Sequence, residues 1–329
     1  MLINLAKAII LAILVGSTII FPSQAFDTAE EQNAAIKPWA ELNADPQYSA
    51  GQSMRFYNLK TENGSQAALV VLDLNDRNFE VLPFFCEHTT SPSDIARKEK
   101  ALAAVNGGFF NLSNGESTSY VVINGKSQCE PKNNKALMEN PTLKPYLETI
   151  FNRSELRILA NKEGKRKAFI MPHNAPIPDG WTLLHSLQAG PMLVPTLTDT
   201  EEAFVRKTDK GKIVDSIGSN KQAARTAVGV THDNHILLLC VASKGQAEYS
   251  SGVTLAQLAK TMSDLGCSQA INLDGGTSTT MVVAEGNFRD AGSYLINKVV
   301  SGNQEKMVKS GLMILKTAGK SKCPYQMPN

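Results

Sequence analysis

Short apolar runs separated by turn-forming residues recur along the chain, and they limit the folds open to it. Residues 67–74 (AALVVLDL), 235–242 (HILLLCVA) and 311–315 (GLMIL) are too short for typical helices. Runs of this length and composition are typical of β-strands. We therefore expect strands to dominate the fold. Further runs that fit this pattern are 54–59, 79–85, 156–160, 168–172, 183–194, 223–230 and 269–273.

Two segments have the pattern of helices instead. Ser91 followed by Pro92 is a typical helix start, and the polar segment after it extends to residue 100. Near residue 260, apolar residues recur at helical spacing, and Gly266 stands where such a helix would end. The recurring residues are Leu255, Leu258, Ala259, Met262 and Leu265. Many strands and few helices predict a single α+β (mixed α/β) domain with a mixed β-sheet core.

The first 25 residues have the composition of a signal peptide. Lys7 precedes an uncharged apolar run at 8–21, and the small residues Ser23 and Ala25 stand at the −3 and −1 positions of a cleavage site. An uncleaved membrane anchor is the alternative, but a run of 14 residues is short for a bilayer span. We therefore expect export to the periplasm or the medium, with no stable membrane anchor after cleavage.

The rest of the chain divides by composition. Residues 26–52 form a polar N-terminal lead-in, 53–318 the predicted domain and 319–329 a C-terminal tail. Within the domain, residues 129–182 carry many Lys, Asn and Pro residues and a predicted hairpin. We interpret 129–182 as a variable insertion that covers the core and is not a separate domain.

Charge and motif content argue against several classes of function. The 33 Lys and Arg residues nearly balance the 31 Asp and Glu residues, so the net charge of +2 does not predict a nucleic-acid partner. The five cysteines show no CxxC spacing, and the sequence contains neither HExxH nor a P-loop. We therefore predict no metal and no cofactor, and the sequence leaves the oligomeric state open.

The segment INLDGGTST, residues 271–279, offers the strongest candidate site. An apolar strand ends at the carboxylate Asp274, and Gly275 and Gly276 let a ligand approach the backbone. Thr277 and Ser278 supply hydroxyl groups for a sugar or phosphate. The alternative is a tight turn whose aspartate caps the backbone.

The segment AVNGGFFN, residues 104–111, repeats this arrangement. Asn106 ends an apolar strand and can donate and accept hydrogen bonds, and Gly107 and Gly108 follow it. Glu116 lies in the Gly/Ser loop just beyond and is a candidate acid or base. A plain turn is again the alternative.

Two further blocks add polar candidates at strand ends. Gln188 precedes the Gly-Pro break of LQAGPML, where it would point at the same pocket. Arg225 opens the strand ARTAVG, where a guanidinium group binds phosphate or carboxylate well. A bend and a surface cation are the respective alternatives. Glu248, in KGQAEYSSG, is a weaker candidate for a site carboxylate.

Taken in order, the four blocks resemble the phosphodiester glycosidase family, whose members include the mammalian enzyme that removes N-acetylglucosamine from mannose-6-phosphate groups. The resemblance runs from about residue 67 to 315 and leaves 129–182 unmatched. Thr277 stands where the family usually has a glycine. The resemblance implies an α/β domain whose glycine-rich loops converge on one pocket.

The resemblance also implies a reaction, namely cleavage of a sugar C1–O–P linkage to a free sugar and a phosphomonoester. Asp274 and Glu116 would then be the catalytic carboxylates, and Arg225 with the Gly275 and Gly276 amides would bind phosphate. Asn106 and Ser278 would hold sugar hydroxyls or phosphate oxygens. The alternatives are a sugar-phosphate or polysaccharide binding protein of envelope or exopolysaccharide metabolism, a phosphodiesterase that cuts P–O, and a purely structural domain.

Overall fold

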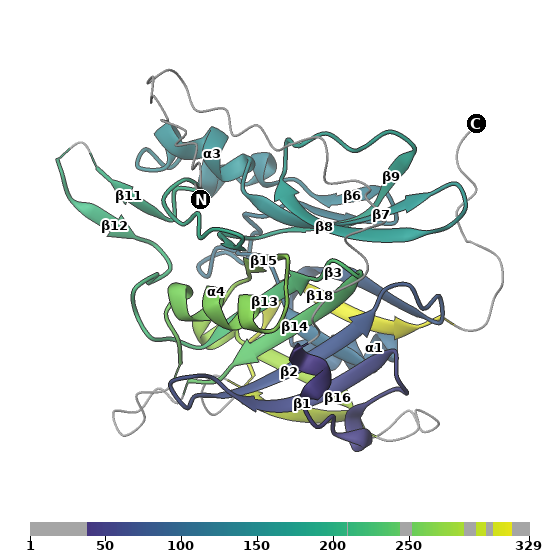
Figure 1. The fold of residues 1–329 in the computed structure, drawn as a ribbon. Coiled ribbons are helices and arrows are strands. Elements are labelled where there is room, and N and C mark those ends of the chain that lie inside the picture. The colour runs from purple at the N-terminus through teal and green to yellow at the C-terminus, as the bar shows by residue number, and fades with distance from the viewer. Residues whose placement is uncertain (1–37, 209, 244–251, 286–293, 301–304, 318–329) are drawn as a thin grey trace, which may run out of the picture. The chain divides into compact units, whose positions relative to one another are not determined.

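Three β-sheets and a small two-stranded sheet make up most of the computed structural model (Figure 1). The structure describes residues 38–208, 210–243, 252–285, 294–300 and 305–317. Neighbouring strands in these residues are antiparallel throughout. The predominance of strands over helices confirms the predicted α+β class.

The first sheet has six strands, and its inner strands are buried on both faces. Double burial explains why residues 236–241 are continuously apolar and do not alternate with polar residues. From edge to edge the strands are β1 (Met54–Lys60), β2 (Gln66–Asp73), β14 (His235–Val241), β13 (Arg225–Val230), β15 (Gln269–Asn272) and β10 (Met192–Val194).

The other two large sheets have five strands each. The second contains β17 (Tyr294–Val300), β16 (Thr280–Ala284), β4 (Ala103–Asn106), β18 (Val308–Lys316) and β3 (Phe79–Thr90). The third contains β6 (Lys126–Cys129), β5 (Val121–Ile123), β9 (Trp181–Gln188), β7 (Ser154–Asn161) and β8 (Arg166–Pro172). The small sheet pairs β11 (Val205–Lys207) with β12 (Ile213–Asp215).

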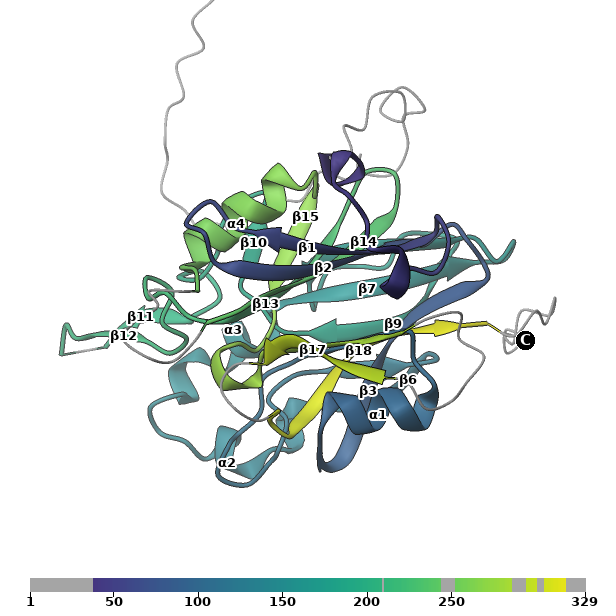
Figure 2. The same ribbon diagram turned by 90° about the horizontal axis from the view of Figure 1, so that it is seen from below.

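Helices cover the outer sides of the first two sheets. Helix α4 (Leu255–Asp264) packs on β10, β13 and β15, and α1 (Pro92–Glu99) packs on the second sheet. Figure 2 shows the two helices on opposite sides of these sheets. The short helices α2 (Lys135–Met138) and α3 (Leu147–Phe151) lie in the insertion. Single 3-10 turns span Pro38–Glu41, Pro46–Tyr48, Pro131–Asn133, Lys144–Tyr146 and Gly276–Ser278.

Both predicted helices begin at side-chain caps. The Ser91 hydroxyl accepts from the Asp94 amide, and Pro92 occupies the first turn of α1 as expected. At α4, Thr254 and Gln257 form a reciprocal capping box. The apolar face predicted near residue 260 is buried against the first sheet. These local interactions satisfy amide groups that would otherwise lack partners at each helix start.

The main hydrophobic core lies where the three sheets meet. Its buried members come from all three sheets, so the three sheets share this core. Along β2, Val70 and Leu72 face this main core, whereas Leu69 and Val71 face a second core under α4. Main-core residues from the insertion are Leu156, Ile158, Ala168 and Ile170. The insertion therefore supplies strands β7 and β8 of the third sheet as well as a cover.

Several sequence predictions concern residues that the structure does not describe. The predicted signal peptide at 1–25 and the tail at 319–329 lie outside the described ranges, as does Glu248. The lead-in is described from residue 38, where Trp39 packs into the second core. The described helices include none that is long and apolar enough to cross a bilayer. The predicted domain boundaries remain predictions.

Candidate active site

The four glycine-containing blocks meet around the end of β15. Asp274 follows this strand, and loops from β4, β9 and β13 reach it from separate parts of the chain. Three backbone hydrogen bonds join the blocks: Asp274 N–H to Gly107 O (2.8 Å), Gly276 N–H to Ala224 O (2.8 Å) and Gly190 N–H to Asn272 O (3.0 Å). The expected convergence of the glycine-rich loops is therefore present in the backbone.

The Asn106 side chain joins these loops through hydrogen bonds. Its amide nitrogen donates to the Asp274 carbonyl (2.5 Å), and its oxygen accepts from the Thr226 hydroxyl (2.7 Å) and the Thr280 amide (3.1 Å). The residue is fully buried. The geometry supports a positioning function for Asn106, because its polar atoms face the protein backbone and Thr226. The predicted contact with a sugar or phosphate has no support from these bonds.

The Asp274 carboxyl group is partly buried at the junction of the blocks. Burial raises its pKa to about 6, although hydrogen bonds from the Ser278 hydroxyl and the Gly275 amide favour the charged form. The Gly275 amide lies 2.9 Å from Oδ1. A carboxyl group that titrates near neutral pH is suited to act as an acid, a base or a nucleophile.

The glycines around Asp274 differ in their surroundings. A Cβ on Gly107 would lie 2.6 Å from the Gly311 Cα, and one on Gly108 would lie 2.7 Å from the Ser119 hydroxyl. These two glycines allow close packing between neighbouring segments. Gly276 has φ +60°, and a Cβ added to it would have nothing within 4 Å, so its surface is open beside Asp274. Thr277, the next residue, is exposed.

Comparison with known proteins identifies the family that has these four blocks. The phosphodiester glycosidase family model matches residues 99–315, which include all four blocks. The chain belongs to the phosphodiester glycosidase family. No curated protein matches the chain.

Solved structures share this phosphodiester glycosidase fold at low sequence identity. One is the zebrafish N-acetylglucosamine-1-phosphodiester alpha-N-acetylglucosaminidase catalytic domain, auto-inhibited by its pro-peptide, with TM-score 0.54, 18% identity and coverage of 83% of this chain and 86% of that chain. A Burkholderia pseudomallei protein described as a candidate exported protein has TM-score 0.54, 16% identity and coverage of 81% and 75%. A hypothetical Synechocystis protein has TM-score 0.52, 16% identity and coverage of 79% of this chain but only 61% of its own.

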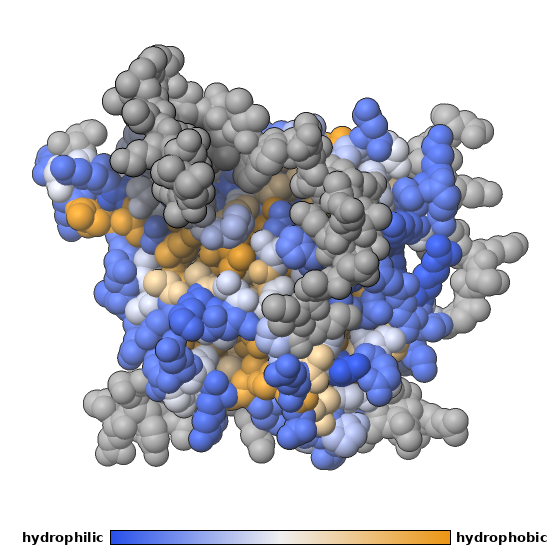
Figure 3. Space-filling view, in the orientation of Figure 1, coloured by the Kyte–Doolittle hydropathy of each residue, from blue (hydrophilic) through white to orange (hydrophobic). Residues whose placement is uncertain are grey.

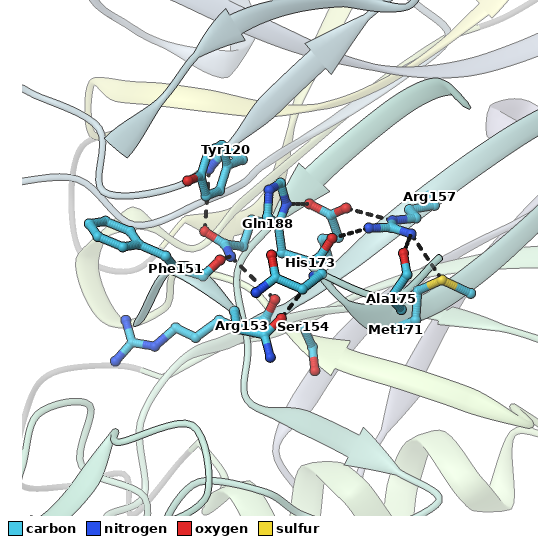
Figure 4. Close-up of polar contacts among 12 residues, drawn as sticks. Tyr120, Phe151, Arg153, Ser154, Arg157, Met171, His173, Ala175 and Gln188 are labelled. Atoms are coloured by element: carbon cyan, nitrogen blue, oxygen red, sulfur yellow. Dashed lines mark hydrogen bonds and ion pairs between the residues drawn. The ribbon is translucent and has the colours of Figure 1, made fainter. Parts of the chain in front are cut away.

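Within this phosphodiester glycosidase fold, Gln188 is buried beneath the insertion. Its amide nitrogen donates to the carbonyls of Phe151 (2.9 Å) and Arg153 (3.2 Å), and its oxygen accepts from the Tyr120 amide (3.4 Å). Figure 4 shows Gln188 between these residues. The side chain therefore joins α3 to β9, and its predicted contact with substrate remains untested.

Arg225 lies beside Gly275 in the candidate site. Its guanidinium group donates to the carbonyls of Val253 (3.1 Å), Ile217 (3.0 Å), Gly218 (2.6 Å) and Lys221 (2.9 Å). These bonds occupy four of its five N–H groups. The side chain is 3% exposed, and burial lowers its pKa. This geometry favours a positioning function, and the predicted phosphate contact stays a prediction.

The proposed anion-binding amides are also occupied within the protein. The Gly275 amide donates to the Asp274 carboxylate, and the Gly276 amide donates to the Ala224 carbonyl. Glu116 is exposed in the loop after β4, where its Oε2 accepts from Asn114 Nδ2 (3.1 Å). No described contact joins Glu116 to Asp274. Its catalytic assignment stays a prediction.

The sequence did not predict two residues that hold the candidate site in place through hydrogen bonds. The Thr226 hydroxyl donates a hydrogen bond to Asn106. In the sequence, only the position of Thr226 beside Arg225 in the ARTAVG block indicated that Thr226 belongs to the site. Glu202 is buried, and its carboxylate braces the Gly190 loop. It accepts from Ser154 N (3.0 Å), Ser154 Oγ (2.8 Å), Met192 N (2.8 Å) and Thr198 Oγ1 (2.6 Å). No motif marks Glu202 in the sequence, and its partner Ser154 lies 48 residues away.

Proposed function

We propose that this chain hydrolyses a sugar-1-phosphodiester by breaking the bond between C1 and the bridging oxygen. Water supplies a hydroxyl group to C1 and a proton to the departing phosphomonoester, so the products are a free sugar and a phosphomonoester. Membership of the phosphodiester glycosidase family supports the reaction class. The observation that carries the proposal is the Asp274 carboxyl group at the junction of the four family blocks, with a pKa of about 6.

Asp274 would act in its charged form. The transition state of glycoside cleavage gathers positive charge at C1, and a carboxylate beside C1 stabilises that charge or attacks as a nucleophile or base. The phosphate leaving group has a second pKa of about 6, so it needs less protonation than a sugar alkoxide. Glu116, in the loop after β4, would be the second carboxylate, as acid, base or hydroxyl ligand.

Sugar release from a panel of sugar-1-phosphodiesters tests this proposal. We expect release by the wild type and a loss of at least about a hundredfold in Asp274→Asn, as for removal of a principal catalytic group. Asp264→Asn, which changes an exposed aspartate at the end of α4, should keep full activity. Near-normal turnover in a folded Asp274→Asn protein would remove the assignment.

Isotope labelling separates two reactions with the same products. In ¹⁸O-water, attack at C1 places the label in the sugar, and attack at phosphorus places it in the phosphate. We expect the label in the sugar. Label in the phosphate would identify a phosphodiesterase that cuts P–O.

The second candidate is a sugar-phosphate or polysaccharide binding protein without turnover. It is favoured because four of the five Arg225 N–H groups and the Gly275 and Gly276 amides are bonded within the protein, whereas a departing phosphate needs neutralisation. Ligand-induced melting shifts without sugar release would support it. Export is part of either proposal, and the mass of the protein recovered from the periplasm or medium tests cleavage after Ala25.

A further inference from the structure

Most polar groups that the sequence predicts to bind substrate form hydrogen bonds within the protein. They are the side chains of Asn106, Gln188, Arg225 and Ser278 and the amides of Gly275 and Gly276. Thr277 differs from them. Its side chain is exposed, and its hydroxyl forms no hydrogen bond with the residues that the structure describes. Among the predicted hydroxyl groups, Thr277 is therefore the one available to a ligand.

The chain itself holds Thr277 close to Asp274. The next residue is Ser278, whose hydroxyl binds the Asp274 carboxylate, and the Cα atoms of neighbouring residues lie about 3.8 Å apart. A hydrogen bond from Ser278 N–H to Gly275 O (3.1 Å) closes the turn around Thr277. The backbone of Thr277 is thus fixed beside the carboxyl group by bonds of its immediate neighbours.

The turn is open on one side of Thr277 and buried on the other. A Cβ added to Gly276, the residue before it, would have no atom within 4 Å. Ser278 and Thr279, the residues after it, are buried. The Thr277 hydroxyl, which can both donate and accept a hydrogen bond, therefore stands at the opening beside Asp274.

The proposed role of Asp274 decides which part of the substrate is nearest to Thr277. A carboxylate that attacks C1, or that activates the attacking water, stands on the face of the sugar opposite the leaving group. The phosphate would then depart on the side away from Asp274. In the sugar ring C1 is bonded to the ring oxygen and to C2, so the C2 substituent is the sugar group nearest to a side chain beside Asp274.

We propose that Thr277 determines the sugar specificity of this chain through a hydrogen bond between its hydroxyl and the substituent on C2. This rests on the proposed function. The substrate class is then the sugar-1-phosphodiesters that carry a hydroxyl or an acylamino group on C2. Hydrogen bonds to the C2 hydroxyl strengthen in the transition state of glycoside cleavage, so the contact favours turnover as well as binding.

A cycle of enzyme and substrate changes tests this contact. The substrates are the methyl diesters of the 1-phosphates of glucose, N-acetylglucosamine and 2-deoxyglucose, each in both anomeric forms. Thr277→Val removes the hydroxyl and keeps the branched shape. We expect it to lower kcat/KM about five- to tenfold for the substrates with a C2 substituent, because one hydrogen bond is lost. For the 2-deoxy substrate kcat/KM should change less than about twofold, since that substrate has no such bond to lose.

Two further variants are the controls. Thr277→Ser keeps the hydroxyl and should retain the wild-type difference between the substrates. Thr182→Val makes the same chemical change at an exposed position near the start of β9 and should leave every kcat/KM unchanged. Thr182 pairs with Ala160 beside the β7–β8 hairpin, where Figure 3 shows a hydrophilic surface. At about 3.3 Å per residue it lies roughly 20 Å along β9 from Gln188.

Calorimetric binding of the same compounds separates this proposal from the proposed function. Equal losses for the substituted and the 2-deoxy compounds in Thr277→Val would overturn the contact, even where the wild type releases sugar. A preference for a C2 substituent that disappears only in Thr277→Val, without sugar release by the wild type, would support the contact and overturn the proposed function. A folded wild type that neither binds nor cleaves these compounds would overturn both.

Discussion

The acidity of one side chain links activity and stability in this fold. Burial raises the pKa of Asp274 from an ordinary 3.8 to about 6. The folded state therefore holds this proton more tightly than the unfolded state. The sign follows from linkage: stability falls as pH rises from about 4 to 6, and the full penalty applies above 6. In the proposed reaction Asp274 acts in its charged form, which becomes the main form as the pH rises through about 6.

Asp274→Asn should therefore stabilise the protein at pH 7.5 while it abolishes sugar release. We expect a gain of about 1–3 kcal/mol in the free energy of unfolding, because the amide has no charge to desolvate and its oxygen still accepts from Gly275. Near pH 4 the gain should disappear. Urea unfolding at both pH values measures it, with Asp264→Asn as the exposed control. An equal effect at the two pH values would contradict the raised pKa.

At this scale the sequence predicted which blocks meet better than it predicted the contacts of their side chains. The order of the four blocks placed Asp274, Asn106 and Arg225 in one region, and the backbone bonds bring those blocks together. The direction of the Asn106 side chain depends on Asp274 and Thr226, which lie 168 and 120 residues away in the sequence. Arg225 meets the carbonyls of the segment between β12 and β13, and no local pattern reveals that contact.

At the scale of elements, Gly107 and Gly276 lie in different surroundings. A methyl group on Gly107 would place its carbon 2.6 Å from the Cα of Gly311, where β4 pairs with β18. Gly107→Ala must push these strands apart, and we expect a loss of more than about 2 kcal/mol in the free energy of unfolding.

Gly276→Ala is the matched comparison for this change. The added methyl group would have no atom within 4 Å, so only the positive φ is penalised, by about 1 kcal/mol. The protein should stay folded and lose sugar release, because the methyl group fills the opening beside Asp274. Denaturant unfolding and turnover measure the two effects. A larger stability loss at Gly276 than at Gly107 would contradict this distinction.

Strands and capped helices were the elements easiest to predict. The continuous apolar runs became β2 and β14 because both faces of the first sheet are covered, and α1 begins at the predicted Ser91 cap. The two-stranded sheet of β11 and β12 was not predicted from the sequence. Its sequence, VRKTDKGKIVD, has no apolar run, since only one face packs against the insertion. Strands that are stabilised mainly by contacts with another segment have only a weak hydrophobic pattern in their own sequence.

At the scale of the whole molecule, the three sheets share one core, and this determines how they unfold. Residues 129–182 supply β7 and β8, whose apolar side chains pack with those of the other sheets. On the outer face of β7, Glu155 and Arg157 form a buried ion pair (2.6 Å) next to His173 (Figure 4). The insertion is thus joined to the other sheets through the main core, and we expect it to unfold together with the first sheet.

The two tryptophans of the chain allow a direct test of this expectation. Trp39 packs in the core beside the first sheet, and Trp181 begins β9 in the third. Trp39→Phe leaves fluorescence from the third sheet alone, and Trp181→Phe leaves it from the first. In each variant the urea midpoints from fluorescence and from far-UV circular dichroism should coincide, whatever the absolute stability. A separate Trp181 transition would mean that the insertion is an independent domain, and the shared core would then not couple the sheets.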